Sequence, residues 1–193
     1  NLHERLLYLR NLEEKKEQVI NAITDQGKMT EDLKKKILSA ETLVAVDDLY
    51  RPYRPKKQTR ATKAKEKGLE PLANILLLQS MEEEAAAFVN AEKGVANAKE
   101  AIAGAKDIIA EMIADMADYR KSIRNCTMKQ GSLVVKAKDE KAASVYEMYY
   151  QYEEPVAKMA GYRVLAINRG EKEKFLTVKL EAPEDRILGY LRK

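Results

Sequence analysis

The sequence is poor in the residues that most often carry chemistry. Its 193 residues include one histidine, His3, one cysteine, Cys126, and no tryptophan. A single cysteine excludes an internal disulfide and any cysteine-based metal cluster, and it favours a reducing compartment. One imidazole gives no support to a serine–histidine–aspartate triad, and no phosphate-binding loop or dinucleotide fingerprint is present. We therefore expect no enzyme activity, no catalytic residue, no metal site and no cofactor.

Long apolar runs are also missing. Runs such as the strongly apolar residues 75–78 are far shorter than the roughly 20 residues that cross a bilayer, and no signal peptide is visible. Hydrophobic residues make up 45% and charged residues 34%, a balance typical of a soluble, helix-rich chain with a real core. We expect no membrane partner. Because helical periodicity is present from the first residue, which is not methionine, we interpret the chain as a fragment of a longer protein.

Positive charge is concentrated in one segment. Residues 51–67 contain eight basic residues and one acid, a local charge of +7 in a chain whose total is +4. Two prolines stiffen this segment, and Tyr50 and Tyr53 lie among its cations, where we expect them to be partly buried. Cations and flat rings on a stiff loop suit phosphates and stacked bases. We predict nucleic-acid contacts by seven cations on one exposed face: Arg51, Arg54, Lys56, Lys57, Arg60, Lys63 and Lys67.

A second reading of the basic segment stays open. Residues 82–118 carry nine acids against three lysines, a net charge of −6, which is typical of a solvated helix face. The basic segment could therefore dock on an acidic partner surface, including this one. Charge alone does not distinguish that docking from nucleic-acid binding.

Apolar periodicity predicts helices over most of the chain. A first long helix bears an apolar face from Leu2 to Ile23 and ends near Gly27. Further helices are predicted after the capping residues Thr30 and Thr59 and at Pro71. Another long helix is predicted from about residue 102 to residue 131, and residues 142–152 are predicted to form a helix that ends before the proline at 155.

Only the C-terminal part carries a strand pattern. Residues 162–168 and 175–180 are β-prone, and the polar spacer between them predicts one β-hairpin, with no strand elsewhere. The fold class is therefore mostly α, a multi-helix scaffold with one small β-hairpin near the C-terminus. We divide the chain into an N-terminal helical part with the basic loop and helix (1–80), a central long-helix part (81–160) and a hairpin followed by a C-terminal helix (161–193).

Several motifs are more specific than composition. Five short segments stand out, in this order: DLYRPYRPKK (48–57), TRA (59–61), GLEPLA (68–73), YYQYEEP (149–155) and RVLAINRGE (163–171). In this order they resemble the signature of the Tex family of transcription accessory proteins, over nearly the whole chain. The sequence departs from that signature at Tyr162, where the family usually has histidine, at Val135, where serine is common, and at Lys174, which replaces a frequent glycine.

The resemblance implies a bacterial cytoplasmic protein that binds nucleic acid and is linked to transcription. It implies a helix-turn-helix-like part, a helical region, an RNase-H-like domain, helix-hairpin-helix elements and a C-terminal oligonucleotide-binding-fold domain. This chain corresponds to the helical region before the RNase-H-like domain, where the family signature contains no catalytic residue.

We therefore expect a non-catalytic scaffold fragment with a basic surface. Its expected partners are RNA or DNA, bound weakly and without sequence preference, the remaining domains of its full-length chain, and the transcription machinery. The alternative is a protein-interaction module whose basic loop docks on an acidic partner surface.

Overall fold

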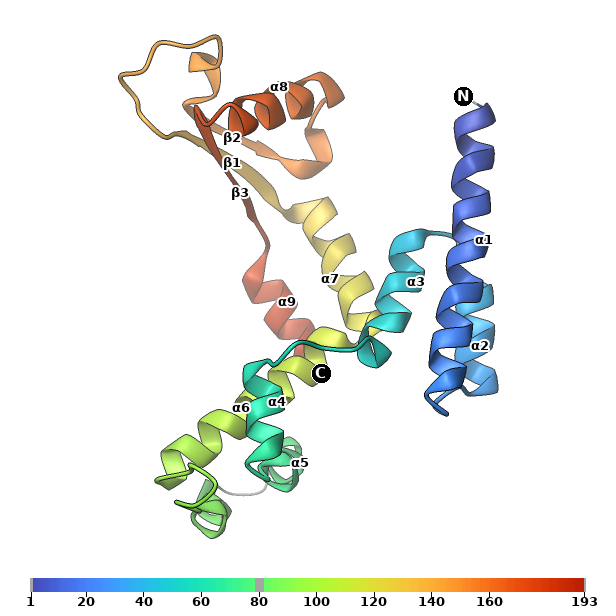
Figure 1. Ribbon diagram of the computed structural model, residues 1–193. Helices are drawn as coiled ribbons and strands as arrows, with labels where there is room; N and C mark the ends of the chain where they lie inside the picture. Colours follow the sequence, from blue (N-terminus) through green and yellow to red (C-terminus); the bar gives the residue numbers. More distant parts are fainter. Residues whose placement is uncertain (1, 79–81, 193) are drawn as a thin grey trace. The chain divides into compact units, whose positions relative to one another are not determined.

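The computed structural model describes residues 2–78 and 82–192 and separates into two compact units, Asn1–Arg120 and Lys121–Lys193. Helices dominate the described residues, and one small antiparallel sheet lies in the second unit (Figure 1). The mostly α fold class with a small β element near the C-terminus is therefore confirmed. The three-part division of the sequence stays a prediction. Among the described residues, no helix combines the length and the apolar character needed to cross a membrane.

The first unit begins with three packed helices, α1 (Leu2–Asp25), α2 (Glu31–Leu38) and α3 (Leu43–Tyr50). The side chain of Thr30 accepts a hydrogen bond from the Leu33 amide, which caps α2 as predicted. Apolar residues from all three helices form one core: Leu12, Val19, Ile23, Ile37 and Val46. Tyr50 and Tyr53 pack partly buried against this core, as expected.

The same unit contains a second core. The 3-10 turn η1 (Arg51–Tyr53) leads through an extended loop to α4 (Arg60–Glu66), α5 (Glu70–Leu77), η2 (Glu82–Phe88) and α6 (Ala98–Asp115). Small residues let α6 approach α4 and α5 closely. A Cβ atom at Gly104 of α6 would lie only 2.4 Å from Cδ1 of Leu69 and 3.4 Å from Cβ of Ala64. Packing at this distance places one side of α6 alongside the basic segment.

The single long helix predicted up to residue 131 is wrong in one respect. α6 ends at Asp115, and α7 (Ala117–Gln130) begins after Met116, whose ψ of 116° is extended. Arg120 stabilises this break, because its Nη1 donates to the Ala114 carbonyl at 3.3 Å and its Nε lies 2.6 Å from an oxygen of Asp48. Asp48 is only 5% exposed. Apolar spacing alone continues through the break and does not reveal it.

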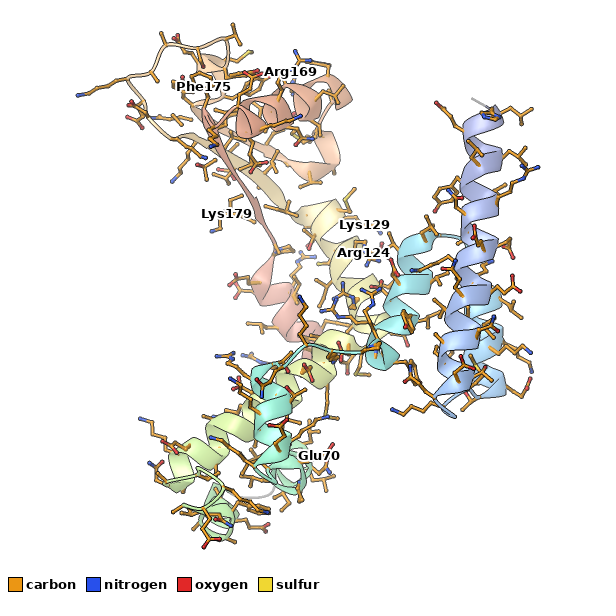
Figure 2. The ribbon with its side chains drawn as sticks, viewed as in Figure 1. Glu70, Arg124, Lys129, Arg169, Phe175 and Lys179 are labelled. Carbon is orange, nitrogen blue, oxygen red and sulfur yellow. The ribbon has the colours of Figure 1, made fainter. Side chains whose placement is uncertain are left out.

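The second unit contains β1 (Ser132–Ala137), β2 (Gln151–Pro155) and β3 (Leu176–Glu181), in the order β2-β1-β3 with both pairs antiparallel. α8 (Gly161–Lys172), α9 (Glu184–Leu191) and two short 3-10 turns, η3 (Glu147–Tyr149) and η4 (Val156–Lys158), complete it. Phe175, which joins α8 to β3, packs on Tyr146 at a ring-centroid distance of 5.9 Å (Figure 2). The core consists of Val135, Tyr146, Tyr149, Ile167 and Leu176.

Three predictions in this unit are wrong. Residues 162–168 form part of α8 instead of a strand, so β3 pairs with β1 and not with them. Residues 142–152 do not form a helix, since they hold η3 and the start of β2. β1 was not predicted at all. The physical reason in α8 is its burial pattern, because Ile167 is 1% exposed while Leu165 is 72% exposed, which is a helical face and not a strand face.

Candidate nucleic-acid interface

The predicted basic segment has a fixed backbone. η1 carries Arg51, and the loop carries Arg54, Lys56 and Lys57. α4 carries Arg60 and Lys63, and Lys67 is its C-cap residue. At the loop–helix junction the Thr59 side chain accepts from the Thr62 amide at 3.1 Å. The Thr62 hydroxyl in turn accepts from the Thr59 amide at 2.7 Å. This reciprocal capping box fixes the direction in which α4 leaves the loop.

A row of carboxylates on α6 faces the segment. Asp107, Glu111 and Asp115 stand four residues apart, which places them on one side of the helix. We call these three residues the acidic row. Asp115 and Glu111 are shielded from solvent, with side chains only 13% and 19% exposed. A shielded carboxylate interacts more strongly with a nearby cation than an exposed one does.

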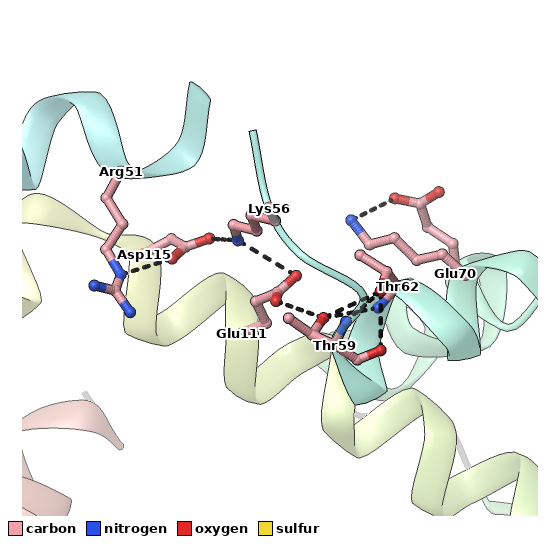
Figure 3. Close-up of polar contacts among 8 residues, drawn as sticks. Arg51, Lys56, Thr59, Thr62, Glu70, Glu111 and Asp115 are labelled. Atoms are coloured by element: carbon pink, nitrogen blue, oxygen red, sulfur yellow. Dashed lines mark hydrogen bonds and ion pairs between the residues drawn. The ribbon is translucent and has the colours of Figure 1, made fainter. Parts of the chain in front are cut away.

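Three cations of the segment pair with this row, and Figure 3 shows two of them, Arg51 and Lys56. The Nε of Arg51 lies 3.1 Å from Asp115, and Lys56 contacts both Asp115 and, at 3.4 Å, Glu111. Arg60 lies 3.1 Å from Asp107. The Thr59 hydroxyl adds a hydrogen bond to Glu111 at 3.0 Å. The loop is therefore held along α6 by polar contacts at several successive points.

Arg54 is held from the other side. Its Nη2 lies 3.0 Å from Asp47, and its guanidinium lies 5.5 Å from the ring centroid of Tyr50. This contact attaches the loop to α3, whose Tyr50 packs on the first core. An exposed pair of this kind contributes little stability on its own, about 0–1 kcal/mol.

The other three predicted cations do not pair with a carboxylate among the described residues. Lys57, Lys63 and Lys67 are exposed, and none of them makes an ion pair with any residue that the structure describes. Lys67 donates a hydrogen bond to the Gly94 carbonyl at 2.8 Å. The seven cations thus divide into four that are paired with carboxylates and three whose charge is unbalanced locally.

The segment and the acidic row together line an open cavity of about 480 Å³. Its lining mixes both signs of charge, from Arg51, Lys57 and Arg60 on one side and the acidic row on the other. Arg60 keeps 86% of its side chain exposed despite its pair with Asp107. The carboxylates offset part of the positive charge while leaving a cationic rim that an anion can reach.

Docking of the basic segment on the acidic region 82–118 was one of the two interpretations of the sequence, and the structure places three carboxylates of that region against the segment. What the sequence analysis missed is which acids these are, although Asp107, Glu111 and Asp115 stand at a regular spacing of four. Within residues 2–78 and 82–192, no group of three or more histidine, cysteine, aspartate or glutamate side chains is arranged to hold a metal ion.

The clearest pKa shifts lie in the second unit. The hydroxyl of Tyr152 and the guanidinium of Arg163 both donate to Glu154, at 2.5 Å each, and lower the pKa of that carboxyl. The same hydrogen bond raises the pKa of Tyr152. These contacts join β2 to α8 and do not converge on a cavity, so we interpret them as structural.

Comparison with known proteins agrees with the motifs. The family described as Tex central region-like matches residues 78–189, more than half of the chain. An uncharacterized protein of Bacillus subtilis, YdcI, is 48% identical over 199 residues, covering 100% of this chain and 28% of that protein. The transcriptional accessory protein Tex of Neisseria gonorrhoeae is 37% identical over 188 residues, covering 95% and 25% respectively.

A more distant relative is S1 RNA-binding domain-containing protein 1 of Homo sapiens. It is 31% identical over 189 residues, covering 93% of this chain and 19% of that protein. The chain spans less than a third of the length of each of these three relatives. The order of its motifs, the family match over α6 to α9 and the identity to these relatives agree, and the chain therefore belongs to the Tex family of transcription accessory proteins.

Proposed function

We propose that this chain is a non-catalytic, cytoplasmic scaffold segment of a Tex-like protein that contributes a basic surface for nucleic-acid phosphates. The observation that carries the proposal is the division of the predicted cations. Four of these cations form ion pairs with carboxylates of the same unit: Arg51, Arg54, Lys56 and Arg60. The other three are exposed and form no ion pair with a described residue: Lys57, Lys63 and Lys67.

Rigid support favours this use of the segment. The capping box, the prolines and the contacts with the acidic row restrict the loop before any ligand arrives, so little conformational entropy is lost on binding. The names of two relatives, a transcriptional accessory protein and an S1 RNA-binding domain-containing protein, agree with a nucleic-acid partner. The partner would be RNA or DNA, bound through phosphates and therefore without sequence preference.

The test is equilibrium binding of the 193-residue chain to labelled single-stranded RNA, single-stranded DNA and duplex DNA across a salt series. We expect weak binding, with Kd on the order of 10⁻⁴ to 10⁻⁶ M. If three cations meet phosphates on the duplex, log K falls with log salt at a slope of about −2.7. The oligonucleotides should be recovered uncleaved in Mg²⁺.

A matched pair of variants makes the test specific. The double variant Lys57→Gln/Lys63→Gln should bind all sequences more weakly. On duplex DNA, the slope of log K against log salt should become less steep by about 1.8. Lys34→Gln with Lys35→Gln removes the same charge from the exposed face of α2 and should leave the slope unchanged. Equal slopes for the two double variants would reject the basic segment as a nucleic-acid surface.

One observation favours a second function. The segment already binds carboxylates, those of the acidic row, at hydrogen-bond distance. A protein-interaction module would use the same chemistry on an acidic surface of a partner, such as a component of the transcription machinery or another domain of the full-length chain. Parent-like oligonucleotide binding by the Lys57/Lys63 variant would favour this function.

A further inference from the structure

Two turns of the first unit share one sequence pattern. Residues 66–69 read Glu-Lys-Gly-Leu and residues 92–95 read Glu-Lys-Gly-Val. In both, the glycine has a positive φ, +79° at Gly68 and +73° at Gly94, a conformation that favours glycine. In both, the apolar residue that follows, Leu69 or Val95, is buried in the same core. The two turns are thus anchored in one core although 22 residues (70–91) separate them in the sequence.

The lysine of each turn reaches the glycine of the other. The Nζ of Lys67 donates to the Gly94 carbonyl at 2.8 Å and lies 3.7 Å from the position that a Cβ atom of Gly94 would take. Reciprocally, the Nζ of Lys93 lies 3.6 Å from the position that a Cβ atom of Gly68 would take. Each ammonium group therefore lies beside the exposed glycine of the other turn.

Both turns are rigid. At the end of α4, the amides of Gly68 and Leu69 donate to the carbonyls of Lys65 and Ala64 at 2.9 and 3.2 Å, the pattern of a Schellman motif. In the second turn, the Asn90 side chain accepts from the amides of Glu92 and Lys93 at 3.0 and 3.2 Å. Asn90 and Val95 also exchange two backbone hydrogen bonds. The two lysines are therefore presented from fixed backbones.

The charge at this place is unbalanced. Neither Lys67 nor Lys93 makes an ion pair with any residue in the described part of the chain, whereas the neighbouring Lys65 lies 3.5 Å from Glu70. Two cations on neighbouring turns without carboxylate partners raise the local positive potential, which favours an anion near them. Lys63 stands one helical turn before Lys67, on the same face of α4, and adds a third exposed cation.

We propose that Lys67 and Lys93 form a phosphate-binding clamp, with Gly68 and Gly94 as its floor. This deepens the proposed function, on which its nucleic-acid ligand rests, and it adds a contact residue, Lys93, that lies outside the basic segment. The ligand class is a phosphate group, supplied either by a nucleic-acid backbone or by free phosphate. Small residues at both glycine positions let the ligand approach the backbone closely.

The experiment uses Lys93→Gln and Lys93→Arg, with Lys34→Gln as the control that removes equal charge elsewhere in the same unit. With a labelled single-stranded oligonucleotide, Lys93→Gln should reduce the salt slope of log K by about 0.7. Lys93→Arg should restore the parental slope because it keeps the charge. With inorganic phosphate, amide resonances of Gly68 and Gly94 should shift and saturate in the parent, and the shift should be lost in Lys93→Gln.

The two ligands separate the possible outcomes. If Lys93→Gln weakens binding of both the oligonucleotide and inorganic phosphate, the clamp takes nucleic-acid phosphates. If Lys93→Gln weakens binding of inorganic phosphate alone, the clamp is a site for free phosphate. If Lys93→Gln matches Lys34→Gln in both measurements, the clamp is overturned. The proposed function fails separately, through parent-like binding by the Lys57/Lys63 variant, because neither of those residues belongs to the clamp.

Discussion

Lys174 adopts a backbone φ of +67°, in the left-handed region where a side chain is strained. It stands directly after α8, where the amides of Lys174 and Phe175 donate to the carbonyls of Glu171 and Gly170, both at 3.0 Å. This is the Schellman arrangement, whose left-handed residue is usually glycine. The geometry therefore favours glycine over lysine at this position.

Replacing Lys174 by glycine should therefore stabilise the chain. We expect Lys174→Gly to raise the free energy of unfolding by about 1 kcal/mol, measured by denaturant titration, because it removes the strain of the left-handed lysine. Lys172→Gly makes the same exchange two residues earlier, inside α8, and should lower that free energy by up to about 1 kcal/mol. A loss of stability in Lys174→Gly would contradict the strain argument.

Single residues were predictable where their partners are local. Thr30 and Thr59 were identified as caps because the amides they bind lie three residues later. The cations of the basic segment were visible for a similar reason, since they cluster in sequence. The acidic region was visible too, but its individual partner residues were not, because Asp115 lies 64 residues after Arg51 and no local pattern joins the two.

At the level of helices, the packing of α6 on α4 and α5 depends on the absence of a side chain at Gly104. Gly104→Ala would place a methyl group 2.4 Å from Leu69, and such overpacking costs about 1–3 kcal/mol. We expect a matching drop in the midpoint of chemical unfolding. Gly189→Ala in α9 is the control, since nothing lies within 4 Å of its added atom and alanine favours helix there. Parental stability in Gly104→Ala would refute close packing at this site.

The join between β2 and α8 should depend on pH. Hydrogen bonds from Tyr152 and Arg163 lower the pKa of Glu154 below its ordinary value of 4.5. The stabilisation from this carboxylate is therefore fully present above about pH 4.5 and is lost as the pH falls through the lower pKa of the folded chain. Glu154→Gln should be less stable than the parent at pH 7, and the difference should shrink on acidification below pH 4.5.

Denaturation of both proteins across that pH range provides the measurement. Glu153→Gln is the matched control because Glu153 is the exposed neighbour of Glu154 on β2. Its difference from the parent should stay nearly constant with pH. A difference for Glu154→Gln that grows toward low pH would have the wrong sign and would exclude this role for the pair with Arg163.

Elements were predictable where periodicity and caps agreed, as in α1, α2 and α4. Residues 162–168 were assigned to a strand because Tyr, Val, Leu and Ile favour strands, but burial of Ile167 beside exposed Leu165 follows a helical face. β2 was hidden because its Tyr152 lies three residues after Tyr149, a spacing that also fits a helix. In both cases packing in the second unit outweighed local propensity.

At the scale of the whole molecule, residues 2–78 and 82–192 build three separate cores, two in the first unit and one in the second. Composition predicted helices and a real core, and both are present. It did not predict how many cores there are or where the chain divides, since those depend on contacts between distant residues. The break between α6 and α7 at Met116 also depends on a contact between distant residues, because Arg120 of α7 pairs with Asp48 of α3.

The order of strands has a consequence for how the chain folds during synthesis. β1 is the central strand, yet both of its partners follow it, and Ala137 pairs with Leu176 only after β2 and α8 have been made. Closing that loop costs entropy, and such non-local pairing is slow. The core of α1, α2 and α3 joins neighbouring segments and can form early. On the ribosome, β1 therefore stays without its second partner until the chain has been extended through Glu181.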